Sequence, residues 1–218
     1  MNCPRCVKEL AHAQQVCGEC GFSLLDQDGQ FGADAVCLTR VTNAQERLTA
    51  AELKKIEAAL DAFERAFPQL FMGVYLAALP NISSLRQFAF WLLNRAAIAS
   101  LEITRPNENG CLLVVDLTTG HVAMVVGYLL ECYFTEAELA ALLEKGRAAW
   151  TKDRVAEGVL QVINAFTKAL RHKSRQAQQD PAKFRPTPPA EPVRPEFQRL
   201  HQPPDGEVAE PVSEQETP

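Results

Sequence analysis

The sequence lacks a long apolar segment. Its two longest apolar runs, Leu70–Leu79 and Val122–Leu130, are shorter than the roughly 20 residues that a membrane-spanning helix needs. The N-terminus opens Met-Asn-Cys-Pro-Arg-Cys, without the cationic start and apolar run of a secretory signal peptide. These two absences predict a protein that is not inserted in a membrane and that stays in the cytoplasm.

An excess of positive charge is also missing. The chain has 22 Lys and Arg against 27 Asp and Glu, a formal charge of −5 at pH 7. Because proteins that hold nucleic acid or anionic lipid usually carry a basic excess, neither is an expected partner. The sequence also has no glycine-rich phosphate loop, cysteine phosphatase signature or nucleophile elbow. The residues by themselves therefore indicate no class of enzyme.

Cysteine, in contrast, is clustered. Four of the seven cysteines form two Cys-x-x-Cys pairs within the first twenty residues, Cys3 with Cys6 and Cys17 with Cys20. Each pair can form a tight knuckle that aims two thiolates at one point, and two knuckles complete a tetrahedral zinc site. Residues 1–24 contain too few apolar side chains to fold unaided, so metal binding would supply their folding free energy. This pattern predicts a structural zinc ribbon.

Other uses of the cysteines are less compatible with the pattern. A redox Cys-x-x-Cys is expected within a βαβ unit, which is missing here. His12, between the pairs, is a further candidate ligand, but four thiolates already close the site. Cys37, Cys111 and Cys132 have no ligand spacing and are expected to be buried or half-buried thiols.

The charges of the ribbon indicate its kind of partner. Through Leu24, Arg5 and Lys8 balance Glu9 and Glu19, so the ribbon lacks the basic excess of a module that binds nucleic acid. We therefore expect it to contact protein.

The rest of the chain alternates helix and strand signals. Thr49-Ala-Ala-Glu52 and Thr135-Glu-Ala-Glu138 are capping boxes that open amphipathic helices. A third capping box, at Ser84, precedes another helix. The apolar run from Leu70 to Leu79 predicts a central strand buried on both faces. Residues Cys111–Leu117 and His121–Tyr128 predict an antiparallel hairpin. A last helix is expected from Asp153 to His172.

These elements predict an α/β fold with a mixed sheet of three or four strands covered by helices. We expect a zinc ribbon at 1–24, a linker at 25–47, the α/β domain at 48–172 and a disordered tail at 173–218. The tail holds ten of the fourteen prolines and few large apolar residues, so it cannot offset the entropy of ordering.

One segment carries a family resemblance. Asn109-Gly110, an apolar strand, a short polar turn, a second strand and Gly127-Tyr128-Leu129-Leu130-Glu131 follow one another. With its flanking helices, the region from about Leu48 to Leu170 resembles the TPM domain family, named for thylakoid-lumen, photosystem-assembly and nematode receptor-modulating members. The resemblance implies an α/β sandwich; phosphatase activity and calcium binding are associated with some members.

The sequence departs from the family pattern at two positions. Leu129 stands where the family has the second glycine of Gly-Tyr-Gly, and Glu108 stands where it usually has aspartate. Glu108 and Glu131 are then a possible second metal site, for calcium, at the strand ends, although solvated carboxylates are the simpler interpretation. We expect a non-enzymatic interaction protein that binds protein partners; the alternative is a metal-dependent phosphatase acting at this acidic site. A small-molecule substrate is not expected.

Overall fold

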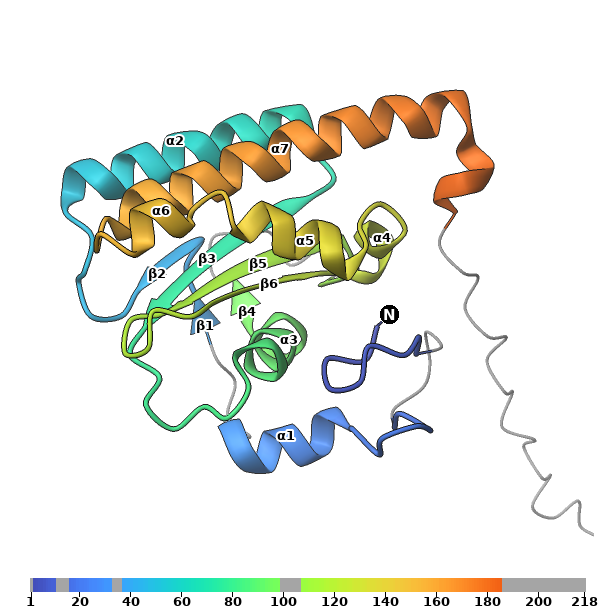
Figure 1. Ribbon diagram of the computed structural model, residues 1–218, viewed down its shortest axis with the longest axis horizontal. Helices are drawn as coiled ribbons and strands as arrows, with labels where there is room; N and C mark the ends of the chain where they lie inside the picture. The colour runs from blue at the N-terminus through green and yellow to red at the C-terminus, as the bar shows by residue number, and fades with distance from the viewer. Residues whose placement is uncertain (1, 11–15, 33–36, 99–106, 186–218) are drawn as a thin grey trace, which may run out of the picture.

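The computed structural model describes residues 2–10, 16–32, 37–98 and 107–185, and is built around a mixed four-stranded sheet (Figure 1). The strand order is β2-β3-β5-β6; β2, β3 and β5 run parallel and β6 runs antiparallel to β5. Their bounds are Val41–Asn43, Phe71–Ala77, Gly110–Asp116 and Val122–Val126. A separate parallel pair joins β1 (Cys37–Leu38) to β4 (Ala97–Ile98). The α/β fold with a mixed sheet is confirmed.

Helices cover both faces of the sheet (Figure 1). The helices of one layer are α2, α5, α6 and α7, with bounds Ala50–Ala66, Glu136–Leu143, Arg147–Trp150 and Val155–Gln179. The other face carries α1 (Leu24–Phe31), α3 (Leu85–Arg95) and the N-terminal cysteine segment. Three short elements complete the described part of the chain: 3₁₀ turns at Asn107–Asn109 (η1) and Pro181–Phe184 (η2), and α4 at Tyr128–Glu131.

The sheet separates two hydrophobic cores. Alternate residues of β3 and β5 face α2 and α7, where Phe63 and Phe166 are fully buried. The intervening residues of β5, Leu112 and Val114, face α3 and its buried Trp91. β3 lies between β2 and β5 and is buried along most of its length, which confirms the prediction of a central strand from its continuous apolar run.

The helix starts follow the caps in the sequence. Thr49 and Thr135 each form a reciprocal capping box, with Glu52 and Glu138 respectively. At α3 the Ser84 hydroxyl accepts a hydrogen bond from the amide of Gln87 at 3.4 Å. These side chains satisfy amides that the first turn of a helix leaves without partners.

The β5–β6 turn is organised by one buried carboxylate. Asp116 is 4% exposed and accepts hydrogen bonds from the amides of Leu79 and Thr118 and from the Thr119 hydroxyl, at 3.0, 2.9 and 2.6 Å. Burial opposes ionisation, but these hydrogen bonds prevail and lower the pKa of Asp116. The turn ends at Gly120, whose φ of 71° favours glycine. Asp116 thereby connects the hairpin to the loop after β3.

Two boundaries differ from those expected. In place of a linker at 25–47 the structure has α1, β1 and β2, and β2 is an outer strand of the main sheet. The last helix does not end at His172 but continues to Gln179, because Lys173 binds Glu138 at 2.6 Å and no proline occurs before Pro181. The remainder of the expected tail, 186–218, lies outside the described residues, as does most of a strand or extended piece expected near 98–104.

No helix in the described part of the chain combines the length and the apolar character that crossing a membrane requires.

Candidate metal centre

The two Cys-x-x-Cys pairs converge on one point. The ligand atoms of Cys3, Cys6, Cys17 and Cys20 all lie within 4.8 Å of one another. The Sγ atoms of Cys3 and Cys20 are 3.5 Å apart, and those of Cys6 and Cys17 are 3.6 Å apart. A tetrahedral ion with metal–sulfur bonds of about 2.3 Å requires sulfurs about 3.8 Å apart, so this donor set fits a four-thiolate ion such as zinc.

The two knuckles are built alike. In the first, the amide of Cys3 binds the carbonyl of Lys8 at 2.8 Å and the amide of Val7 binds the carbonyl of Cys3 at 2.9 Å. In the second, the amide of Cys17 binds the carbonyl of Phe22 at 2.8 Å, and the amide of Gly21 binds the carbonyl of Cys17 at 2.8 Å. Both turns require a left-handed residue: φ is 65° at Val7 and 68° at Gly21. Glycine adopts this conformation freely, whereas valine does so at a cost.

The thiols do not share one pKa. Burial raises the pKa of Cys3, and burial also raises that of Cys20, to about 12. The backbone amide of Cys20 lowers the pKa of Cys17 to about 7. Four thiolates this close repel one another, so full deprotonation needs a cation among them. A closed set of four thiolates leaves no open position, which makes a bound ion structural rather than catalytic.

The cysteine segment, residues 2–10 and 16–23, packs on the second face of the sheet. Phe22 is 2% exposed and meets Phe90 of α3 edge to face, with 5.8 Å between the ring centroids. Arg5 lies over the Phe22 ring at 5.5 Å. The amide of Asn2 donates a hydrogen bond of 2.8 Å to Oε1 of Glu131. The segment is therefore attached to the domain by both apolar and polar contacts.

The two carboxylates of the predicted second site come from neighbouring elements, η1 for Glu108 and α4 for Glu131. Burial, followed by the charges of Glu9, Glu108 and Glu131, raises the pKa of Tyr128. These three carboxylates thus lie around one tyrosine, and Glu9 comes from the cysteine segment. Among the described residues, however, the four cysteines form the only group of three or more potential ligands whose donor atoms converge.

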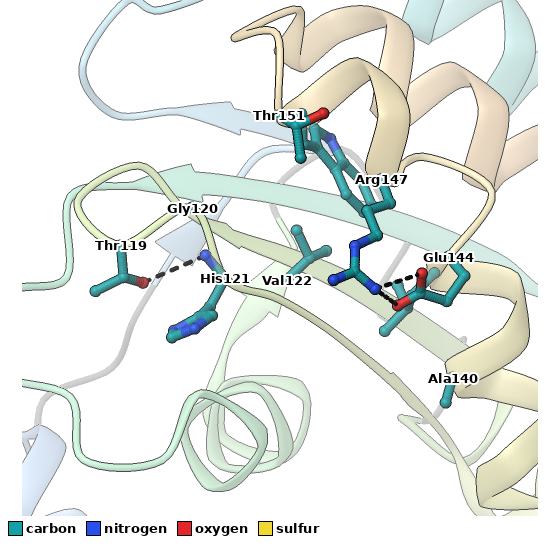
Figure 2. Close-up of a pocket in the computed structure, with 10 residues that line it drawn as sticks. Thr119, Gly120, His121, Val122, Ala140, Glu144, Arg147 and Thr151 are labelled. Atoms are coloured by element: carbon teal, nitrogen blue, oxygen red, sulfur yellow. Dashed lines mark hydrogen bonds and ion pairs between the residues drawn. The ribbon is translucent and has the colours of Figure 1, made fainter.

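Other residues considered from the sequence lie elsewhere. His121 is exposed in the turn just before β6, beside a cavity between the β5–β6 hairpin and α5–α6 (Figure 2). Cys111 is fully buried and Cys132 is half-buried, as expected for thiols without ligand spacing. His12 and the side chain of Cys37 lie outside the described residues.

Two features of this region were missed in the sequence. The hydrogen bond from Asn2 to Glu131 joins residues 129 positions apart, and no short-range pattern predicts such a contact. The equivalence of Val7 and Gly21 was detectable, because each directly follows the second cysteine of its pair.

Comparison with known proteins identifies the larger domain. The family model described as the TPM domain matches residues 41–169. This match begins at β2, inside the segment that was expected to be a linker. No curated protein gives a significant match to the chain.

Several solved structures align with this chain. The NMR structure of the BA42 protein from Bizionia argentinensis aligns with a TM-score of 0.50 and 17% identity, over 60% of this chain and 86% of that one. The N-terminal domain of a P. gingivalis protein aligns with a TM-score of 0.48 and 21% identity, over 61% of this chain and 82% of that one. The N-terminal domain of the cg2496 protein from Corynebacterium glutamicum aligns with a TM-score of 0.47 and 16% identity, over 60% of this chain and 79% of that one. The likeness to BA42 supports the fold alone.

Proposed function

Because the chain belongs to the TPM domain family over residues 41–169, we propose that it is an adaptor that binds protein partners through that domain and an N-terminal zinc ribbon. The ribbon is a rigid extension of the domain and has no catalytic role. We place the protein in a reducing compartment such as the cytoplasm, because zinc binding requires the four cysteines as thiolates.

The observation that carries this proposal is the distribution of exposed apolar side chains. The described residues include four large hydrophobic side chains that are exposed, and three of them lie within the first 25 residues. Val7, Val16 and Leu25 are 46%, 52% and 68% exposed. Val7 and Val16 lie in the cysteine segment and Leu25 lies at the start of the adjoining α1. A concentration of exposed apolar side chains in one part of the chain is typical of a protein that contacts another protein, whereas single exposed ones need no explanation.

Electrostatics favour the same kind of partner. In the first 24 residues, Arg5 and Lys8 balance Glu9 and Glu19. A module with no basic excess has little attraction for a phosphate backbone. A protein surface with an apolar centre is therefore the expected partner.

The alternative function is a metal-dependent phosphatase that uses Glu108 and Glu131. It is favoured by the position of both carboxylates near Tyr128, where a divalent ion would find two oxygen ligands. It is disfavoured by the hydrogen bond that Asn2 donates to Glu131, which occupies one of those oxygens. An adaptor needs neither carboxylate, so the two functions make opposite predictions.

The adaptor is tested by affinity capture with the full chain. Zinc-loaded wild type, a Val16→Asp/Leu25→Asp variant and a Leu129→Asp variant are compared by mass spectrometry of the captured proteins. Leu129 is the fourth exposed apolar residue and lies on the TPM domain, so its variant is the matched control. We expect a partner that is retained by wild type and by Leu129→Asp but lost by the double variant.

A set of captured proteins that does not differ among the three chains would contradict the adaptor. The phosphatase is tested separately, with an aryl phosphate and Ca²⁺, Mg²⁺ or Mn²⁺. Metal-dependent hydrolysis that disappears in Glu108→Gln/Glu131→Gln would replace the adaptor with the alternative. Metal analysis of the purified protein tests the ribbon, because a four-thiolate site holds one zinc ion.

A further inference from the structure

The C-terminal part of α7 and the turn after it carry a concentration of positive charge. Residues 168–185 hold six of the 22 Lys and Arg residues but only one of the 27 Asp and Glu residues, a formal charge of +5. Because the whole chain has a formal charge of −5, the remaining 200 residues have −10. This acidic protein therefore has one strongly basic segment, which its net charge conceals.

Three of these cations share one side of the helix. Lys168, Arg171 and Arg175 are spaced by three and four residues, so they form a row about 10 Å long, here called the basic face. All three are exposed, and none forms an ion pair with any residue that the structure describes. Lys173 lies on the other side of the helix, where it binds Glu138 at 2.6 Å. The domain thus uses one cation of this segment and leaves the row unpaired.

Helix stability does not account for the basic face. Cations stabilise the last turn of a helix through its dipole, but the last turn of α7, residues 176–179, has no Lys or Arg. Like charges three and four residues apart on a helix repel each other, and α7 has no Asp or Glu after Glu157 to offset this repulsion. The row is therefore unfavourable in the free chain and becomes favourable when an anionic group lies against it.

Most of the basic face lies on an extension of the domain. Leu170 is the last buried residue of α7, and Figure 1 shows this helix continuing past the end of α2. The match to the TPM family ends at residue 169, so Arg171 and Arg175 lie outside it. These two arginines are therefore in a position to contact a separate molecule without disturbing the core of the domain.

The surroundings of the basic face distinguish among anionic partners. None of the large exposed hydrophobic side chains of the described residues lies on α7, so this helix has nothing to insert into an anionic membrane. A nucleic acid would extend beyond a row of about 10 Å and would be repelled by the rest of the chain, with its formal charge of −10. A short acidic segment of a protein contacts the row alone and avoids this repulsion.

We propose that the basic face binds an acidic helix of a partner protein. Glu or Asp residues at intervals of three and four on that helix form a row with the spacing of the cations, about 4.5 and 6 Å along the axis. Alternate residues of a strand are about 6.7 Å apart, so a third acid on a strand would lie about 3 Å out of register. The proposal rests on the adaptor function, because it names the chemistry of a protein partner.

The test is binding of a defined acidic helix to the purified full chain. The probe is a fluorescent alanine-based peptide with glutamates at intervals of three and four, and binding is followed by fluorescence anisotropy at low and at high salt. Arg171→Glu/Arg175→Glu should bind the peptide at least about tenfold more weakly than wild type, because two attractions become repulsions. Higher salt should weaken binding to wild type, since the contacts are exposed. Absence of binding to wild type overturns the proposal.

Lys54→Glu/Lys55→Glu is the matched control. It makes the same change in net charge at two exposed lysines near the start of α2, at the opposite end of this helix layer (Figure 1). It should bind the peptide as wild type does, and equal weakening in the two variants overturns the proposal, because net charge would then explain the binding. A second peptide of the same composition, with its glutamates spread around the helix, should bind more weakly. Equal binding of the two peptides also overturns the proposal.

Two outcomes would assign the basic face to another occupant and so overturn the proposal. A DNA duplex that binds wild type more tightly than the peptide does would indicate nucleic acid. Peptide binding that appears only in Glu207→Gln/Glu210→Gln/Glu214→Gln would indicate that acidic residues of this chain occupy the face. The capture experiment described above changes no residue of α7. A negative capture therefore contradicts the adaptor whether or not the peptide binds, and a negative peptide result leaves the capture unaffected.

Discussion

Replacing Gly21 with alanine should weaken metal binding through the backbone alone. Gly21 has a φ of 68°, and a Cβ added there would meet no heavy atom within 4 Å. The substitution therefore creates no steric clash, and its cost is that of holding an L-residue in the left-handed region, about 1–2 kcal/mol. Because metal binding and folding of the segment are coupled, this energy appears as a loss of zinc affinity of about 5- to 30-fold.

The assay is competition for zinc against a chromophoric chelator, with the full chain at fixed pH. Gly29→Ala is the matched control: a Cβ added at Gly29 would also meet no heavy atom within 4 Å, but this glycine lies inside α1 with helical backbone. Alanine is favoured over glycine in a helix by about 1 kcal/mol, so zinc affinity should be unchanged or slightly higher. The reasoning is refuted if Gly21→Ala retains wild-type affinity, or if Gly29→Ala weakens binding equally.

Three further predictions concern other parts of the molecule. Gly158→Ala should lower the free energy of unfolding in urea by about 1–3 kcal/mol, because its Cβ would lie 2.1 Å from Nε1 of Trp150 in a packed layer; unchanged stability would contradict this contact. Asp116 has a lowered pKa in the folded protein, so its stabilising contribution is present above the unfolded pKa of about 3.9 and is lost as the pH falls through the folded value. The free energy of unfolding in urea should therefore decline less steeply below pH 4 in Asp116→Asn than in wild type. Equal declines in the two proteins would show that ionised Asp116 does not contribute to stability. Removal of the metal by a chelator should make the bond after Lys8 accessible to trypsin while α7 stays resistant, and simultaneous cleavage of both would show that the cysteine segment and the domain unfold together.

The sequence predicted those parts of the fold that depend on local patterns. The caps at Thr49 and Thr135 act within three residues, and the continuous apolar run of β3 is typical of a strand covered on both faces. The cysteine cluster was predictable for a related reason, because ligand spacing within each pair is a short-range property.

The elements that were missed depend on contacts that are distant in sequence. β2 is three residues long and is defined by its pairing with β3, so no periodicity marks it within a polar segment. α1 has a polar sequence, and Asp28 fixes it to α3 through Trp91 at 2.8 Å and Arg95 at 2.7 Å. The end of α7 was misplaced because a change in composition at Lys173 resembles a domain boundary, although Lys173 itself binds Glu138.

The attachment of Asn2 to Glu131 has a consequence for how the chain is made. Asn2 is among the earliest residues synthesised, and Glu131 follows 129 residues later. At about 5–20 residues per second, this separation corresponds to roughly 6 to 26 s of translation. The proposed ion could bind as soon as Cys20 has emerged, before the contact with Glu131 can form. An ion bound that early would be held during this interval by the four thiolates alone, so it would have to dissociate slowly before the surrounding protein has folded.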